Sequence, residues 1–117
     1  MWFNEAEGAV MTNKFYTLDG KLIGTGYFYE YKNFTGIIIG QYKKTWYYNG
    51  KTHRENGPAS VWHIGHKEWC SNGKLHRLDG PAVECADGSK AWWVDGKRIT
   101  EQEHKLLYDL LRLKGLL

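Results

Sequence analysis

Histidine and arginine recur together in this chain, and they are the first residues whose chemistry calls for an explanation. The pair His53-Arg54 returns 23 residues later as His76-Arg77. A histidine in such a place could act as a general base. Catalysis needs one site, however, whereas a residue that returns in every repeat is usually needed by each unit for its structure. We therefore expect both pairs to be structural, with the two side chains stacking on a neighbouring tryptophan and bonding to the Asp-Gly-Pro turn.

Two other residue pairs could bind a metal or form a disulfide. His63 and His66 lie three positions apart, but no third ligand follows nearby, so no metal site is expected. Cys70 and Cys85 have neither metal nor redox spacing, and we expect two reduced thiols; a single disulfide stays open because the repeats stack closely. No phosphate loop, nucleophile elbow or paired-carboxylate motif occurs. The sequence thus predicts no catalytic residues, no metal, no cofactor and no enzymatic activity.

Basic residues also recur, directly after predicted turns. Lys51, Lys74 and Lys97 occupy equivalent positions, as do Arg54 and Arg77. Aligned along one edge beside exposed aromatics such as Tyr47 or Trp93, such a ladder could hold a nucleic-acid strand through charge and stacking. The alternative is that a lysine at a hairpin turn is a solvated edge residue that discourages aggregation. The lysines and both arginines are candidate binding residues.

These residues belong to a motif that is present three times, opened by Trp46, Trp69 and Trp92. The first two copies continue through Asn-Gly-Lys, His-Arg and Gly-Pro-Ala, and self-similarity at a fixed period predicts a repeat architecture. Asn-Gly or Asp-Gly between aromatic and β-branched runs indicates a type I′ hairpin turn. We expect the tryptophans to be structural and to stack along the array. Hairpin turns are predicted at residues 19–20, 49–50, 72–73, 87–88 and 95–96.

The number of strands in each repeat depends on the Gly-Pro-Ala step. If the chain reverses there, each copy has three strands and the Asn-Gly-Lys turns alternate between edges. If it only bulges or kinks, each copy has two strands and these turns share one edge. We favour two, because 23 residues hold two strands of about six residues with their turns. The predicted fold is mainly β, an antiparallel meander of stacked hairpin repeats.

The repeats are flanked by two different segments. Residues 1–43 are a degenerate first unit, because Tyr16-Thr-Leu-Asp19-Gly20-Lys21 matches the start of the motif. Its insertion contains Tyr27, Tyr29 and Tyr31, which share one face of a predicted strand, and Gly36-Ile-Ile-Ile-Gly40 reads as a more buried strand. Repetition does not explain these tyrosines, so they are candidate binding residues.

Residues 101–117 change to a helical period. Thr100 and Glu103 form a capping box before a helix expected at about 101–114, and Gly115 is a plausible stop. Its apolar stripe consists of Leu106, Leu107, Leu110, Leu111 and Leu113. We expect this helix to cap the open end of the array. A partner-binding or dimerising helix is the alternative.

The composition is that of one globular domain. The 117 residues are 42% hydrophobic and 25% charged, with a formal net charge of +3. The aromatic content of 15% is more than a core of this size needs. No apolar run reaches the roughly 20 residues of a membrane span, and the start of the chain is acidic where a signal peptide is basic. A cytoplasmic location without membrane attachment follows.

The string Asn-Gly-Lys-x-His-Arg-x-Asp-Gly-Pro-Ala, preceded by tryptophan, resembles a short repeat of uncharacterised bacteriophage, bacterial and giant-virus proteins. That family is similar in period and hairpin character to MORN repeats. The resemblance covers about residues 44–100 and extends weakly over 15–43. It implies a phage-type accessory protein that acts by contact. The regular Tyr-x-Gly and His-Gly-x-Gly pattern of MORN repeats is missing, so the resemblance does not imply lipid binding.

The expected function is a binding module that engages or inhibits a host protein, for example a defence component, in the host cytoplasm if the protein is viral. Interfaces favour tyrosine, tryptophan and arginine, and the two aromatic types are abundant in this chain. The alternative is nucleic-acid or nucleotide binding through the basic ladder. A homodimer through the C-terminal helix is a further expectation.

Overall fold

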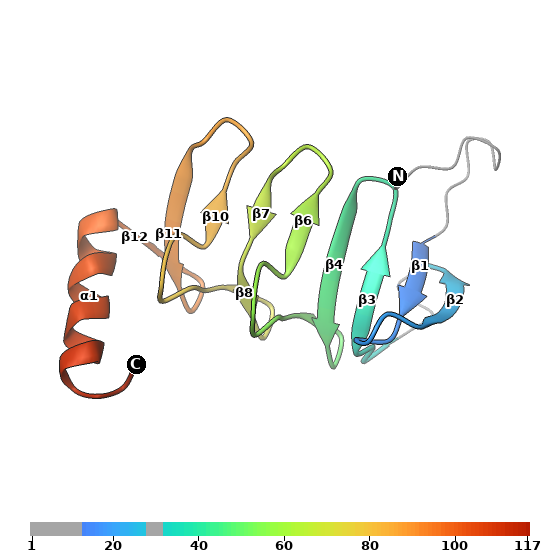
Figure 1. Cartoon of the computed structure of the whole chain (residues 1–117), viewed down its shortest axis with the longest axis horizontal. Coiled ribbons are helices and arrows are strands. Elements are labelled where there is room, and N and C mark those ends of the chain that lie inside the picture. Colours follow the sequence, from blue (N-terminus) through green and yellow to red (C-terminus); the bar gives the residue numbers. More distant parts are fainter. Residues whose placement is uncertain (1–12, 28–31) are drawn as a thin grey trace.

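Antiparallel hairpins follow one another along the chain and end in one helix, as the computed structural model in Figure 1 shows. The structure describes residues 13–27 and 32–117. The molecule measures 52 × 30 × 21 Å. The strands are β1 (Asn13–Tyr16), β2 (Leu22–Gly26), β3 (Gly36–Ile39), β4 (Lys43–Tyr48), β5 (Lys51–Thr52), β6 (Ser60–Trp62), β7 (Lys67–Glu68), β8 (Cys70–Ser71), β9 (Lys74–Leu75), β10 (Val83–Glu84), β11 (Lys90–Val94) and β12 (Lys97–Ile99), and the helix is α1 (Glu101–Leu113).

The main sheet runs in the order β12-β11-β10-β7-β6-β4-β3-β1-β2, and every strand pair is antiparallel. This confirms the predicted meander of hairpins with a C-terminal helix. Within the first repeat, β5 and β6 both pair with β4 on the same side, and residues 54–58 leave the ladder between them. Each repeat therefore has two strands, the second interrupted by an excursion loop. The turns of the three repeats, at residues 49–51, 72–74 and 95–97, lie along the lower edge in Figure 1, as the two-strand interpretation predicted.

The turns are where the sequence placed them, but they are of two types. Asn49, Asn72 and Asp95 have φ angles of 48°, 51° and 48°, and the glycine after each is also positive, as type I′ requires. At residues 19–20 and 87–88 only the glycine is positive. At the second of these turns the Gly88 N–H donates to the Cys85 carbonyl at 3.0 Å. This bond is typical of a longer hairpin loop that is built on a type I turn. The type I′ assignment of these two turns was wrong, because the aspartate keeps an ordinary right-handed conformation.

Large apolar side chains gather near the N-terminal end of the sheet. Phe15, Phe34 and Ile38 form a buried cluster, and Phe15 meets Phe34 edge-on at 5.3 Å between ring centroids. Strand β3 is buried, as predicted. Tyr47 packs against this cluster, and burial raises the pKa of its hydroxyl. The expectation of an exposed Tyr47 was therefore wrong, because strand alternation turns Tyr47 inward and Tyr48 outward.

The repeats contribute small buried residues instead of a second large core. Ala59 and Ala82, the alanines of the two Gly-Pro-Ala steps, are both 0% exposed. The Ala59 carbonyl accepts from the backbone N–H of Trp46 at 2.7 Å, and the Ala82 carbonyl accepts from the backbone N–H of Trp69 at 2.8 Å. The Gly-Pro-Ala step thus returns the chain to the ladder after each excursion loop.

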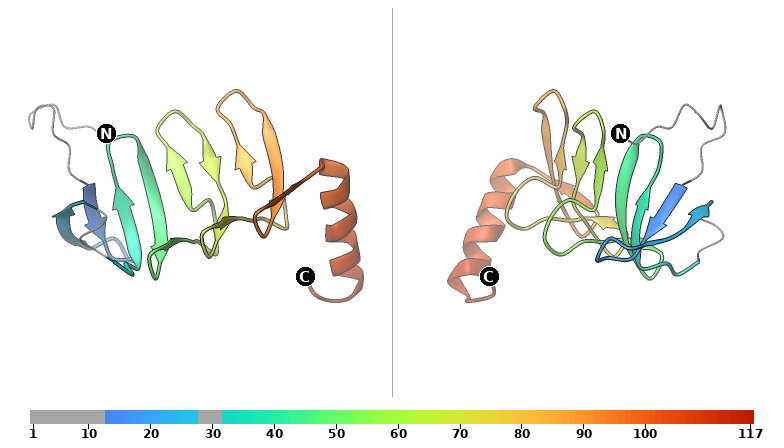
Figure 2. Two further views of the ribbon diagram at one scale, coloured as in Figure 1. Left: turned by 180° about the vertical axis from the view of Figure 1, so that it is seen from behind. Right: turned by 45° about the vertical axis from the view of Figure 1, so that its right-hand side comes forward.

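Helix α1 begins and ends as predicted. Thr100 and Glu103 form both hydrogen bonds of the capping box, and Gly115 follows the helix with a φ of 72°. The predicted leucine stripe divides between two environments. Leu107 and Leu111 are half-buried, whereas the other three leucines are exposed, because only one side of the helix reaches the end of the sheet (Figure 2). Within residues 13–27 and 32–117, no helix has the length and apolarity needed to cross a bilayer.

Candidate functional site

The excursion loop of each repeat folds its arginine back over the tryptophan of the same repeat. The Arg54 guanidinium lies 3.8 Å from the Trp46 ring centroid, and Arg77 lies 3.9 Å from that of Trp69. Burial lowers the pKa of Arg54. The predicted arginine–tryptophan stacking is confirmed. Among the described residues, no ring contact joins the three tryptophans to one another, and each arginine covers the tryptophan of its own repeat.

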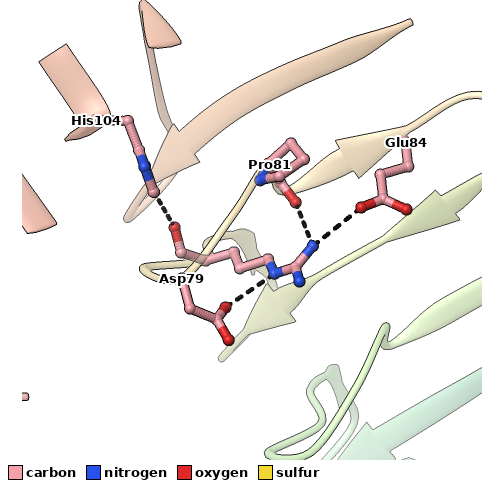
Figure 3. Close-up of polar contacts among 5 residues, drawn as sticks. Asp79, Pro81, Glu84 and His104 are labelled. Carbon is pink, nitrogen blue, oxygen red and sulfur yellow. Dashed lines mark hydrogen bonds and ion pairs between the residues drawn. The ribbon is translucent and has the colours of Figure 1, made fainter. Parts of the chain in front are cut away.

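Arg77 has the fuller set of polar partners, shown in Figure 3. Its Nη1 donates to the Pro81 carbonyl at 3.0 Å and to Glu84 at 3.2 Å, and its Nε donates to Asp79 at 2.9 Å. Its own carbonyl accepts from His104 Nε2 of α1 at 2.7 Å. This arginine therefore links the excursion loop, β10 and the capping helix.

Arg54 makes the first of these bonds but has fewer partners. Its Nη1 donates to the Pro58 carbonyl at 3.2 Å. Asn56 stands where the second repeat has Asp79, and Val61 stands where it has Glu84. Both arginines are thus engaged inside their repeats, and the second is held more firmly.

The two histidines join one hairpin to the next. Nδ1 of His53 accepts from the N–H of Asn72 at 3.1 Å, and Nδ1 of His76 accepts from the N–H of Asp95 at 3.0 Å. These bonds require an unprotonated Nδ1 and therefore place the proton of His53 on Nε2, which lies 2.7 Å from Glu55. The structural interpretation of the histidines is supported, but their partner is the next turn and not a tryptophan.

The three turn lysines form a ladder along the lower edge of the sheet. The stem of Lys51 lies against the position a Cβ would take on Gly73, and the stem of Lys74 lies in the same way against Gly96. Lys51, Lys74 and Lys97 are all exposed. A side chain at Gly73 or Gly96 would need a strained positive φ, so the turn favours glycine at both positions, whereas the lysine stems would make only ordinary van der Waals contact with an added Cβ.

Two grooves lie beside the excursion loops, one between the β1–β2 turn and the first loop and one between the two loops. The first groove, of about 680 Å³, is lined by Leu18, Trp46, Tyr47, Tyr48, His53, Arg54, Glu55, Asn56 and Asn72. The second groove, of about 720 Å³, lies between the loops that carry Arg54 and Arg77. Tyr48 is 52% exposed and Leu18 is 57% exposed, so the first groove presents more apolar surface to an approaching partner.

The predicted site residues fall into three groups. Arg54 and Arg77 line the grooves, and the three lysines form the ladder. Tyr27 is exposed but directly follows β2 instead of lying on a strand, while Tyr29 and Tyr31 lie outside the described residues. The sequence interpretation missed Leu18 and Tyr48. Alternation along β4 could have identified Tyr48, since it shares a face with Trp46.

The remaining candidates have local partners. Both cysteines are free thiols, so the disulfide alternative is excluded, and burial raises the pKa of Cys70. His63 approaches the Tyr42 carbonyl at 3.2 Å, and His66 approaches Glu68 at 3.2 Å. In the part of the chain that the structure describes, no group of three histidine, cysteine or acidic side chains is placed to hold a metal ion.

Comparison with family models, with curated proteins and with solved structures gives no match to this chain.

Proposed function

We propose that this chain is a non-enzymatic binding module that recognises another protein through the first groove. The observation that carries the proposal is the exposed pair Leu18 and Tyr48 beside Trp46 and Arg54 in one concave surface. Tyrosine, tryptophan and arginine dominate the binding energy of protein interfaces because they bury large areas and also donate hydrogen bonds. The arginine is held in place by the tryptophan, so little side-chain freedom is lost on binding.

The histidines support binding over catalysis. Both accept the same hydrogen bond from the next turn at nearly the same distance. Each histidine therefore has a structural role that is repeated along the array. A folded His53→Ala/His76→Ala double variant that lost a measurable turnover would overturn this part of the proposal.

The biological setting follows from the repeat resemblance alone. We propose a phage-type accessory protein that binds or inhibits a host protein, such as a defence component, in the host cytoplasm. Tyr27, Tyr29 and Tyr31 remain proposed contacts of that partner.

Affinity capture from the natural host with matched variants tests the groove. Tyr48→Ser and Leu18→Ser should each lose the captured partner, since each removes apolar area from the groove. Tyr42→Ser is the control, because Tyr42 is also exposed but does not line the first groove. Capture that is unchanged by both groove variants, as judged by quantitative mass spectrometry, would refute the proposal.

The lysine ladder favours a second function, binding of single-stranded nucleic acid. Successive lysines are two strands apart, or about 10 Å, so three of them reach about three phosphates. The logarithm of the association constant should then fall with the logarithm of salt concentration with a slope of about −2. A slope near zero, or binding unchanged in a Lys51→Ala/Lys74→Ala/Lys97→Ala variant, would exclude this function.

A further inference from the structure

Strand β11 has an open edge on the side that faces α1. It pairs with β10 through Lys90 and Ala91, and with β12 through Trp92 to Val94. On the side away from β10, no described strand lies beside Lys90 and Ala91. Figures 1 and 2 show β12 turning away toward α1 at this point.

The equivalent position is filled in both earlier repeats. There β6 lies beside Lys44 and Thr45, and β10 lies beside Lys67 and Glu68. In the third repeat the chain has become α1 where the next strand would begin. The last repeat therefore has a position for one more strand beside Lys90 and Ala91, and no described strand fills it.

The vacant position offers both backbone groups and space. The Ser89 carbonyl accepts from the Cys85 N–H of the neighbouring hairpin arm at 2.8 Å, and successive residues of a strand point to opposite sides. Lys90 therefore directs its N–H and carbonyl away from β10. They face a cleft of about 420 Å³ lined by β11, by β12 and by the first turn of α1, including Arg98, Glu101 and Glu103.

We propose that this edge cleft binds an extended, acidic segment of another protein, which adds to the sheet as a strand antiparallel to β11. The second repeat supplies its chemistry, because there β10 fills the equivalent position, whereas in the first repeat Val61 lies opposite Lys44. Glu84 of β10 lies opposite Lys67 on one side and Lys90 on the other, and Val83 lies opposite Ala91. A strand on the vacant side in the same register places an acidic residue opposite Lys90 and a small β-branched residue opposite Ala91. Cross-strand charge pairing and main-chain hydrogen bonds would hold it.

A second copy of this chain fits the cleft less well than a different protein. Its matching segments, β6 and β10, are each already paired on both sides. Among the strands that the structure describes, the outermost one at the other end of the sheet is β2, whose sequence Leu-Ile-Gly-Thr-Gly contains no acidic residue. The edge cleft is also formed by different residues from the first groove, so either site can fail without the other.

A peptide with the sequence of residues 80–86, carrying Cys85→Ser, is the probe, titrated into the isotope-labelled full chain. We expect shifts centred on the amides of Lys90 and Ala91. A peptide with Glu84→Lys should bind about tenfold more weakly, and a Lys90→Glu protein should reverse this preference. Absence of binding at millimolar peptide, or an unchanged preference, would overturn the proposal.

Two further changes isolate the backbone contact. Lys90→Pro removes an outward N–H without removing a bond to β10, and it should abolish binding, whereas Lys90→Ala retains the N–H and should bind measurably. Should Lys90→Pro unfold the chain, N-methylation of the peptide at the Glu84 position tests the same hydrogen bond on the unaltered protein. Equal binding by the methylated peptide would contradict strand addition. Self-association of the free chain that Lys90→Pro removes would assign the edge to a second copy and also overturn the proposal.

Discussion

At the scale of single residues, the two arginines show how one side chain can replace part of a hydrophobic core. Each covers a tryptophan face and at the same time serves a carbonyl of its own excursion loop. A planar guanidinium can do both, because its N–H donors lie in the plane of the group and its flat face is weakly hydrated. An aliphatic side chain would cover the ring but leave the loop carbonyl without its donor.

This arrangement predicts a graded loss of stability. Arg77→Ala should lower the free energy of unfolding by about 2–3 kcal/mol, since it removes a cation–π contact and charged hydrogen bonds. Arg54→Ala should cost less, about 1–2 kcal/mol, because Arg54 lacks the two acidic partners. Lysine at position 77 should recover only part of the loss. Urea unfolding measures all three; equal costs at both positions would contradict the assigned contacts.

Cys70 provides a residue-scale test of burial. Because burial raises the pKa of its thiol, the folded state favours the neutral form. This contribution to stability is complete below the pKa of the unfolded thiol and is lost as the pH rises through the higher folded pKa. In a Cys85→Ser variant at about pH 8.5, iodoacetamide should therefore modify folded Cys70 at least about tenfold more slowly than the urea-unfolded chain. Equal rates would show that the thiol is not buried.

At the scale of elements, the hairpins are joined by bonds at their turns. The Gly73 N–H donates to the Thr52 carbonyl at 2.8 Å, and the Gly96 N–H donates to the Leu75 carbonyl at 2.9 Å. The histidine bonds lie beside these and have the same period. The lower edge is therefore a continuous set of contacts between neighbouring turns, which the short strands β8 and β9 could not supply alone.

Substitution of His76 separates its hydrogen bond from its other properties. His76→Ala should lower the free energy of unfolding by about 1 kcal/mol, since the Asp95 N–H loses its acceptor. His76→Asn should recover most of this, because its side-chain oxygen can stand near the place of Nδ1. Urea unfolding and amide exchange at Asp95 measure the effect. If asparagine and alanine behaved alike, the accepted hydrogen bond would not be the role of this histidine.

Helix α1 presents an apolar face that the sheet does not cover. Leu106, Leu110 and Leu113 are exposed at spacings of four and three, the spacing of a helix–helix seam. We predict a weak dimer, formed at about tens of micromolar because three leucines give an interface below the usual size. Sedimentation across a concentration series should show Leu110→Lys as a monomer, with Arg112→Ala unchanged. A wild-type chain that stays monomeric at about 1 mM would contradict the prediction.

At the scale of the whole molecule, the period and the turn residues were enough to predict the meander, the two strands per repeat and the capping helix. They could do this because positive φ at Asn-Gly and a capping box are local requirements. The period and the turn residues could not predict the contacts between elements. The bond from His76 to the next turn and the groove that Leu18 forms with Tyr48 depend on how hairpins stack, which no local spacing contains.

The architecture itself predicts that one repeat can be removed. Deletion of residues 57–79 joins Asn56 to Gly80, restores an Asn-Gly-Pro-Ala step and offers the Arg54 carbonyl to His104 in place of that of Arg77. Because each repeat contacts its neighbours, the shortened chain should fold cooperatively, with a urea m-value lower by about a fifth in proportion to the surface lost. Deletion of residues 46–67 is the matched control. It joins Thr45 to Glu68 inside a strand, and the one extra residue turns the rest of that strand over, so it should not fold. Circular dichroism during urea titration distinguishes the two variants. If the in-register deletion failed to fold, the stability of the array would depend on contacts beyond nearest neighbours, and the repeat would not be its structural unit.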